Sequence, residues 1–178
     1  MKYRAFLHSD PDNFQYELKY YHNPKRWYAN ELESDNPIKN ISNWSEEIKY
    51  LNDNNDTCSA EIKKLPTDTG GIYVFYLKGI NISFIENYIL YIGRCQYTVN
   101  QNIRKRAMEY LTDNRIMIQE MFRRWKQHLY YRYFPNNNNN ETCRDEILLI
   151  KAIFPEYNEE IPDKIIKVRK EPAFKSIL

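Results

Sequence analysis

Two short runs of β-branched and aromatic residues constrain the fold of this chain most strongly. Residues 70–77 read Gly-Gly-Ile-Tyr-Val-Phe-Tyr-Leu, and residues 88–93 read Tyr-Ile-Leu-Tyr-Ile-Gly. These residue types favour strands, and a continuous apolar run is typical of a strand that is buried on both faces. The sequence therefore predicts two buried strands, which we expect to pair antiparallel because Lys78-Gly79 turns the chain between them.

Helical periodicity follows the second run. Apolar side chains recur on one face of residues 100–112 and again on one face of residues 115–128, which predicts two helices. The apolar positions are Ile103, Ala107, Tyr110 and Leu111 in the first helix, and Ile118, Met121, Phe122, Trp125 and Leu129 along the second.

A third strand and a third helix complete the predicted domain. Residues 129–134 have the composition of a strand, the asparagine-rich run 136–140 predicts a flexible connector, and residues 141–154 predict a helix that Pro155 ends. The expected fold class is α/β (α+β), with a small, mainly antiparallel three-stranded sheet flanked by helices.

The residues before this domain predict an accessory region. Residues 14–21 alternate roughly in polarity, as a strand does. Ser42 is a candidate helix N-cap, and a helix that begins there would place Trp44, Ile48 and Leu51 on one face. The chain thus divides into an N-terminal accessory region, a main domain and a C-terminal tail, at residues 1–66, 67–160 and 161–178.

The composition is that of a soluble globular protein, with 42% hydrophobic and 28% charged residues among 178. No run approaches the roughly 20 apolar residues that a membrane helix needs, and no signal-peptide core follows the first residues. We therefore expect a cytoplasmic protein without a membrane partner. The three cysteines, Cys58, Cys95 and Cys143, contain no C-x-x-C pair, which argues against a disulfide framework or a zinc ribbon.

Positive charge is concentrated in the middle of the chain. Residues 94–132 contain 9 Lys/Arg and 3 Asp/Glu, a net charge of +6, whereas residues 1–70 contain 9 Lys/Arg and 12 Asp/Glu, a net charge of −3. A phosphate-binding face requires such a basic block, although a solvated helix face gives the same pattern. Charge alone leaves both interpretations open.

Two charged side chains fall on or beside apolar helix faces. At about 100° per residue, Glu146 lies inside the apolar arc that contains Ile147 and Ile150, where a carboxylate must be paired, hydrogen-bonded or bound to metal. Arg106 lies at the margin of the apolar face that contains Tyr110, so we expect it at the edge of a cleft. The alternative is that Arg106 and Glu146 form an ion pair and do nothing more.

Two tyrosines in the predicted strands favour a functional site over a simple ion pair. Singly, Tyr73 and Tyr91 are typical of core aromatics. Together, Gly71-Ile72-Tyr73 and Tyr91-Ile92-Gly93 resemble the two signatures of the GIY-YIG nuclease family. The resemblance covers about residues 66–160.

The resemblance continues in order along the chain. Arg106 and Tyr110 are similar to the family's helical arginine and the His-or-Tyr position one turn later. Glu146 and the segment 155–158, Pro-Glu-Tyr-Asn, are similar to the family's metal-binding glutamate and its proline-to-asparagine ending. The chain departs from the family in a longer connection between the tripeptides, and in a long segment before Arg106 that makes Arg104 the alternative functional arginine. The longer connections are more similar to the restriction-enzyme branch than to the homing or repair branches.

The resemblance implies hydrolysis of a DNA phosphodiester by in-line attack of water, with one Mg²⁺ or Mn²⁺ ion. It implies that Tyr73 is the base, that Tyr91 and Tyr110 orient the water or share its proton, and that Arg106 braces the phosphate. Glu146 would bind the metal, and Asn158 would hydrogen-bond to Glu146 or Tyr73. The basic residues expected to contact double-stranded DNA are Arg94, Arg104, Lys105, Arg115, Arg123, Arg124, Lys126 and Arg132.

Several functions compete at this point. A restriction or phage-defence endonuclease is the leading hypothesis, and a repair or mobile-element nuclease would use the same chemistry. A catalytically inactive DNA-binding module and a structural protein whose tyrosines serve the core are the alternatives from other classes. Dimer contacts and target-site reading are the roles considered for residues 1–66, and a homodimer is accordingly among the expected partners.

Overall fold

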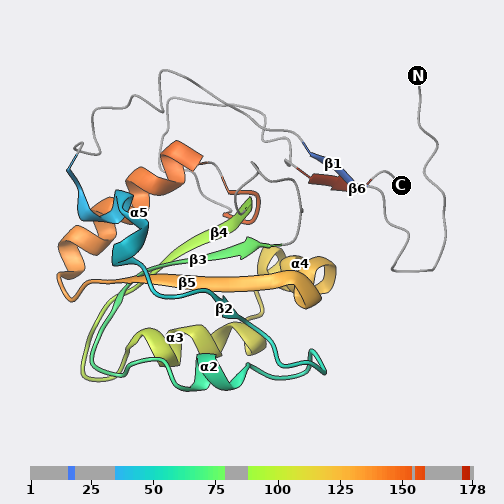
Figure 1. The fold of residues 1–178 in the computed structure, drawn as a ribbon, viewed down its shortest axis with the longest axis horizontal. Helices are drawn as coiled ribbons and strands as arrows, with labels where there is room; N and C mark the ends of the chain where they lie inside the picture. The colour runs from blue at the N-terminus through green and yellow to red at the C-terminus, as the bar shows by residue number, and fades with distance from the viewer. Residues whose placement is uncertain (1–15, 19–34, 79–87, 154, 159–173, 177–178) are drawn as a thin grey trace.

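A four-stranded antiparallel sheet organises a mixed α+β fold (Figure 1). The computed structural model describes residues 16–18, 35–78, 88–153, 155–158 and 174–176. The strands lie in the order β2-β5-β3-β4, with the bounds Ile48–Lys49, Leu129–Pro135, Gly71–Leu77 and Tyr88–Cys95. The mixed class is confirmed. The expected count of three strands is wrong, because β2 pairs with β5 and adds a fourth.

The central strand β3 is buried along its whole length. Its neighbours β4 and β5 both pair with it antiparallel, so the predicted pairing of the first two strands is confirmed. Gly71 begins β3 with a φ of +130°, a conformation that favours glycine, and a Cβ there would lie 2.0 Å from the backbone oxygen of Phe134. The close approach of β5 therefore requires the glycine of the Gly-Ile-Tyr signature.

Side chains of β3 alternate between two cores. Tyr73, Phe75 and Leu77 belong to the larger core, which includes residues of α3 and α4. Ile72, Val74 and Tyr76 belong to the other core, which includes Ile150 of α5. In Figure 1, α5 lies on one side of the sheet and α2 and α3 lie on the other. The helices α2, α3, α4 and α5 have the bounds Ala60–Lys63, Ile103–Glu109, Ile116–Trp125 and Asn139–Ile153.

The two helices predicted after the second strand are confirmed, with 3₁₀ extensions at their ends. Tyr110–Thr112 extends α3, and Lys126–His128 extends α4. Asn102 caps α3, since its side-chain oxygen accepts a hydrogen bond from the backbone N–H of Lys105 at 3.0 Å. The expected apolar positions are buried or partly buried except Leu111, which is exposed because the tighter 3₁₀ turn rotates it off the helix face.

The helix predicted to begin at Ser42 is wrong. Residues 41–43 form a 3₁₀ turn instead, and Ile48–Lys49 extends as β2 against Tyr130 and Tyr131. Trp44 packs against Phe134 with their ring centroids 5.9 Å apart. Without β2 the backbone of β5 would be left as an open edge, so strand pairing outweighs the helical pattern of this segment.

The asparagine-rich run is not the flexible connector that its composition predicts. Helix α5 begins inside it, at Asn139. The side chain of Asn139 accepts a hydrogen bond from Tyr97 N at 2.8 Å and donates one to Tyr97 O at 3.1 Å. Asn137 accepts a hydrogen bond from Gly70 N at 2.9 Å. These amides join the start of α5 to the ends of β3 and β4.

The terminal strands form a separate pair. β1, at Tyr16–Leu18, lies within the predicted strand at 14–21 and pairs antiparallel with β6, at Phe174–Ser176. The remaining residues of that predicted strand and Gly79 of the predicted turn lie outside the described residues. Among the residues that the structure describes, no helix is both long and apolar enough to span a membrane.

Candidate active site

A cavity of about 580 Å³ lies beside β4, which is the last strand at one edge of the sheet. Its walls combine side chains from both faces of the sheet, because β4 is the last strand and the cavity passes around it. Three tyrosines, three arginines and one glutamate line it. The residues that line it are Tyr73, Tyr91, Arg94, Arg106, Arg115, Met117, Ile118, Glu146, Ile147, Ile150, Tyr157 and Asn158.

Gly93 allows Tyr73 to reach this cavity. Tyr73 and Gly93 are cross-strand partners in β3 and β4. A Cβ at residue 93 would lie 2.5 Å from the Tyr73 hydroxyl oxygen and 2.6 Å from its Cζ. The Tyr73 ring therefore occupies the space above the glycine. Gly93, the glycine of the second signature, leaves the space that Tyr73 of the first signature occupies.

The hydroxyl of Tyr73 lies in a short hydrogen-bond network. It is 2.6 Å from the Tyr110 hydroxyl, and it accepts a hydrogen bond from Arg106 Nε at 3.1 Å. The Arg106 guanidinium also donates to Glu109 at 3.2 Å and lies 5.0 Å from the centre of the Tyr110 ring. Tyr73, Arg106 and Tyr110, which the sequence placed in one catalytic set, are thus in direct contact.

Burial decides the protonation of these phenols. It raises the pKa of Tyr73 well above its ordinary value, and the charge of Arg106 opposes that rise without cancelling it. Burial likewise raises the pKa of Tyr110. Burial acts to lower the pKa of Arg106, but Tyr73, Tyr110 and Glu109 raise it above its ordinary value, so the guanidinium stays charged. The resting network therefore consists of two neutral phenols and one cation.

Tyr91 has its own arginine. Arg115 donates a hydrogen bond from Nη1 to the Tyr91 hydroxyl at 3.3 Å. Its guanidinium lies 5.8 Å from the centre of the Tyr91 ring and 5.6 Å from that of Tyr110. Asp113 fixes this position through bonds of 3.0 Å from Nε and 2.6 Å from Nη2. The sequence predicted Arg115 only as a contact to the DNA backbone, whereas the structure brings it into the cavity.

Glu146 pairs with Arg94 across the edge of the sheet. The Glu146 side chain is 13% exposed and that of Arg94 is 37% exposed. Burial raises the pKa of Glu146, while Arg94 and, more weakly, Arg106 act to lower it. The predicted semi-buried carboxylate is confirmed, but its ion-pair partner is Arg94 rather than Arg106. Arg94 follows Gly93 on β4, and strand alternation turns it toward α5.

Asn158 holds the edge strand. Its side-chain oxygen accepts a hydrogen bond from Ile92 N at 2.9 Å, and its side-chain nitrogen donates to Ile92 O at 2.7 Å. Tyr157 N donates to Leu90 O at 3.0 Å in the same way. The family resemblance led us to expect a hydrogen bond from Asn158 to Glu146 or Tyr73, but the side-chain bonds described here go to Ile92. The bonds to Ile92 follow from the open edge of β4, whose outward backbone groups need partners.

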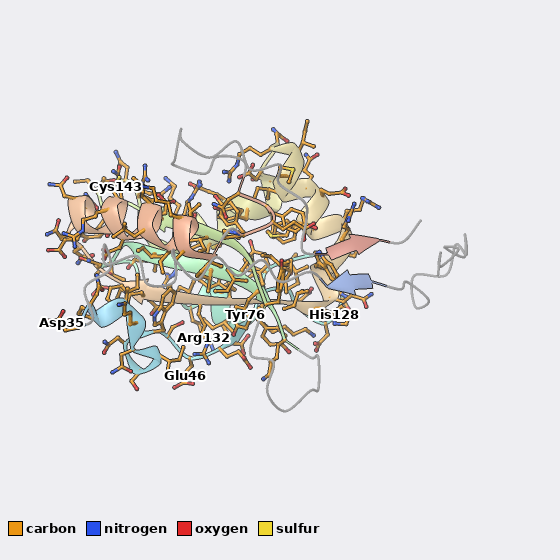
Figure 2. The ribbon with its side chains drawn as sticks, turned by 90° about the horizontal axis from the view of Figure 1, so that it is seen from above. Asp35, Glu46, Tyr76, His128, Arg132 and Cys143 are labelled. Atoms are coloured by element: carbon orange, nitrogen blue, oxygen red, sulfur yellow. The ribbon has the colours of Figure 1, made fainter. Side chains whose placement is uncertain are left out.

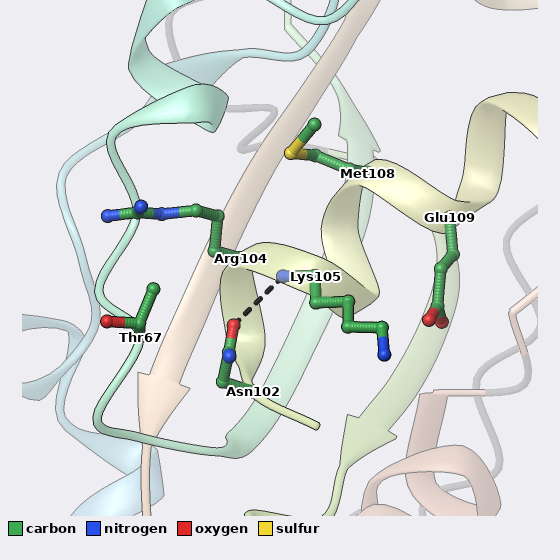
Figure 3. A pocket seen from close by; sticks show the side chains of 6 residues that line it. All are labelled: Thr67, Asn102, Arg104, Lys105, Met108 and Glu109. Atoms are coloured by element: carbon green, nitrogen blue, oxygen red, sulfur yellow. Dashed lines mark hydrogen bonds between the residues drawn. The ribbon is translucent and has the colours of Figure 1, made fainter. Parts of the chain in front are cut away.

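Arg104 lies outside this cavity. It borders a separate hollow of about 400 Å³ together with Thr67, Asn102, Lys105, Met108 and Glu109 (Figure 3). Its Nε donates to the backbone oxygen of Leu65. Of the two arginines considered for the functional position, Arg106 is the one that lines the tyrosine cavity.

The other predicted DNA contacts are distributed over the surface. Arg123 and Arg124 both bond to Glu120, which lowers the pKa of that carboxyl to about 2. Lys105 and Lys126 are exposed. Arg132 lies beside Tyr76 on the sheet face that bears α5 (Figure 2). These residues do not line the tyrosine cavity, so the structure separates them from Arg94, Arg106 and Arg115.

The cavity offers one carboxylate to a metal ion. Within the described part of the chain, no three His, Cys, Asp or Glu side chains converge as a metal-binding group. Mg²⁺ nevertheless often takes only one or two protein carboxylates and completes its shell with water and phosphate oxygens. Glu146 fits that donor set, provided that Arg94 moves from the carboxylate or shares it.

Comparisons with protein-family models, curated proteins and solved structures gave no match. The sequence did not predict that Asp113 belongs to the site. It also did not predict that Arg94 pairs with Glu146 or that Arg115 bonds to Tyr91. The alternation of β4 contains a signal for Arg94, but no periodicity places Arg115, since it lies in the turn before α4.

Proposed function

We propose that this protein is a divalent-metal-dependent endonuclease that hydrolyses DNA phosphodiester bonds. One observation carries the proposal: two phenols, a guanidinium and a carboxylate from separate elements line one cavity. The lining has three arginines, Arg94, Arg106 and Arg115, and one carboxylate, Glu146, so its formal charge favours a bound anion. Arginine forks match the paired oxygens of a phosphate, and the phenols provide hydroxyl groups for water.

The reaction forms a bond between a water oxygen and phosphorus while the bond from phosphorus to one ester oxygen breaks. The water gives up a proton, and the leaving oxygen gains one. Arg106 contacts the non-bridging oxygens, where negative charge develops. Tyr73 receives the water's proton in its phenolate form, which the Arg106 charge favours. Tyr91 orients the water through its hydroxyl, and Tyr110 shares the proton through its contact with the Tyr73 hydroxyl.

A divalent ion bound to Glu146 would stabilise negative charge on the phosphate and on the leaving oxygen. The remaining residues have roles without it. Asp113 and Glu109 hold the arginines in place, and Asn158 fixes the strand that carries Tyr91. This division predicts that DNA binding and DNA cleavage respond differently to substitution.

Plasmid cleavage tests the proposal. Unmodified supercoiled plasmid is incubated with the protein and Mg²⁺ or Mn²⁺, and the experiment is repeated with Glu146→Gln. The expected result is nicked or linear DNA with the unaltered protein, and a loss of cleavage with retained DNA binding for the variant. Glu141→Gln is the matched control, because Glu141 is exposed on the same helix and lies outside the cavity lining. Absence of cleavage with either ion would favour a DNA-binding module.

The substrate class can be refined in the same assay. A restriction or phage-defence enzyme should cut unmodified duplex DNA and spare methylated DNA from the same source. A repair or mobile-element nuclease should prefer branched, damaged or intron-target DNA. Sequencing the cut ends distinguishes these outcomes.

A further inference from the structure

A second arginine–carboxylate pair lies beside the Tyr110 ring, as the first one does. Arg106 bonds to Glu109 and to the Tyr73 hydroxyl, and Arg115 bonds to Asp113 and to the Tyr91 hydroxyl. The two guanidinium carbons lie 5.0 Å and 5.6 Å from the centre of the Tyr110 ring. Each signature tyrosine therefore has its own arginine, and each arginine has its own carboxylate.

Arg115 retains donors for a ligand. A guanidinium has five N–H donors. Asp113 engages Nε–H and one hydrogen of Nη2, Tyr91 engages one hydrogen of Nη1, and Tyr110 is a further side-chain hydrogen-bond partner. These partners leave part of the donor capacity unused, and the side chain is 41% exposed and lines the cavity, so a ligand there can reach the guanidinium. The bonds to Asp113 fix the guanidinium before a ligand arrives, which reduces the entropy lost on binding.

A role in stability alone does not explain where the Arg115 guanidinium lies. The Asp113–Arg115 ion pair joins residues two apart in the turn before α4, and it can form there without any contact to the tyrosines. It does not require the guanidinium to lie against two rings or to bond to a buried phenol of a different element. That placement is useful if the guanidinium must be aligned with Arg106 around a common ligand.

We propose that Arg115 is a second phosphate-binding residue of the site, positioned by Asp113, and that Arg106 and Arg115 hold the same phosphate between them. This inference rests on the proposed function for its substrate, a phosphodiester. It adds a residue that contacts the non-bridging oxygens from the Tyr91 side of the cavity.

The test is metal-free binding of thymidine 3′,5′-bisphosphate, measured by calorimetry at low salt with EDTA present. The unaltered protein should bind this probe more tightly than thymidine. Arg115→Gln should weaken binding about tenfold or more, as expected for the loss of charge-assisted hydrogen bonds. Asp113→Asn should weaken it by a smaller factor. Arg144→Gln is the control, because Arg144 is exposed on α5 outside the cavity lining.

The outcomes separate this inference from the proposed function. If Arg106→Gln weakens binding while Arg115→Gln leaves it unchanged, the second arginine is not a phosphate ligand and the site remains. If the unaltered protein binds the bisphosphate no better than thymidine, the phosphate site and the proposed function both fail. Should Arg115→Gln not fold, the Arg115 Nε–Hε NMR signal of the unaltered protein decides. A shift at saturation supports the proposal, and an unmoved signal overturns it.

Discussion

Gly93 leaves room for the Tyr73 hydroxyl, and replacing the glycine tests how much this room matters. Gly93→Ala would place a Cβ 2.5 Å from the hydroxyl oxygen, so either the ring or strand β4 must move. We expect a loss of about 1–3 kcal/mol in the free energy of unfolding, measured by urea denaturation, together with reduced cleavage. In a Tyr73→Ala background the same substitution should be less destabilising. Equal effects in both backgrounds would contradict the contact.

Tyr73 predicts a particular pH dependence. Its pKa is raised above the ordinary value by burial, so the phenolate is the minor form at neutral pH and its fraction grows as the pH rises. The cleavage rate should therefore increase with pH through the neutral and mildly alkaline range, by about tenfold per unit when the phenolate is the base. Tyr73→Phe should lose this dependence. A rate that falls as the pH rises would argue against Tyr73 as base.

Arg94 and a divalent cation should compete for the carboxylate of Glu146. Because Arg94 is paired with Glu146, a cation must displace or share it. Arg94→Gln should tighten Mn²⁺ binding by about two- to fivefold, the size of a partly exposed ion pair. Calorimetry without DNA measures this directly, with Glu146→Gln as the variant that should lose binding. Unchanged or weaker Mn²⁺ binding by Arg94→Gln would contradict the competition.

At the scale of elements, the amides at the start of α5 join three parts of the fold. Asn139→Ala removes both hydrogen bonds to the Tyr97 backbone. We expect a loss of about 1–2 kcal/mol in the free energy of unfolding. Asn140→Ala is the matched control, since its side chain is exposed in the next position. Equal stability of the two variants would contradict this role of Asn139, and the asparagine-rich run 136–140 would then be only a connector.

The elements with strong periodicity were predictable from the sequence. The runs that became β3, β4 and β5 carry apolar and β-branched residues with little ambiguity, and the apolar stripe of α4 is regular. Residues 42–51 were predicted wrongly because their backbone takes its partners from β5, which no local pattern reveals. The asparagine run was misjudged for a similar reason, as its amides bind strand ends that are distant in the sequence.

The candidate site was predictable in its residue types but less so in its contacts. The sequence identified Tyr73, Tyr91, Arg106, Tyr110 and Glu146. Four of them line one cavity, and Tyr110 lies behind it with its hydroxyl 2.6 Å from that of Tyr73. The pairing of Glu146 with Arg94, the bonds from Asn158 to Ile92 and the stacking of Arg115 depend on how the edge of β4 is covered. Such contacts between distant elements leave no periodic signal in a sequence.

At the scale of the whole molecule, the fold brings residues from both faces of the sheet to one edge. Tyr73 and Arg106 come from the side that carries α3, and Glu146 comes from the α5 side. Both groups reach the same cavity because β4 is the last strand and has glycine at residue 93. We therefore expect these groups to act together on one phosphate.

A double-mutant cycle on plasmid cleavage tests that claim most directly. The rate is measured for the unaltered protein, Tyr73→Phe, Glu146→Gln and the double variant, with folding checked by circular dichroism. Residues that act as a unit have strongly non-additive effects. We predict that the double variant is about as slow as the slower single variant. Independent, multiplicative losses, or full activity of Glu146→Gln, would contradict a single shared site.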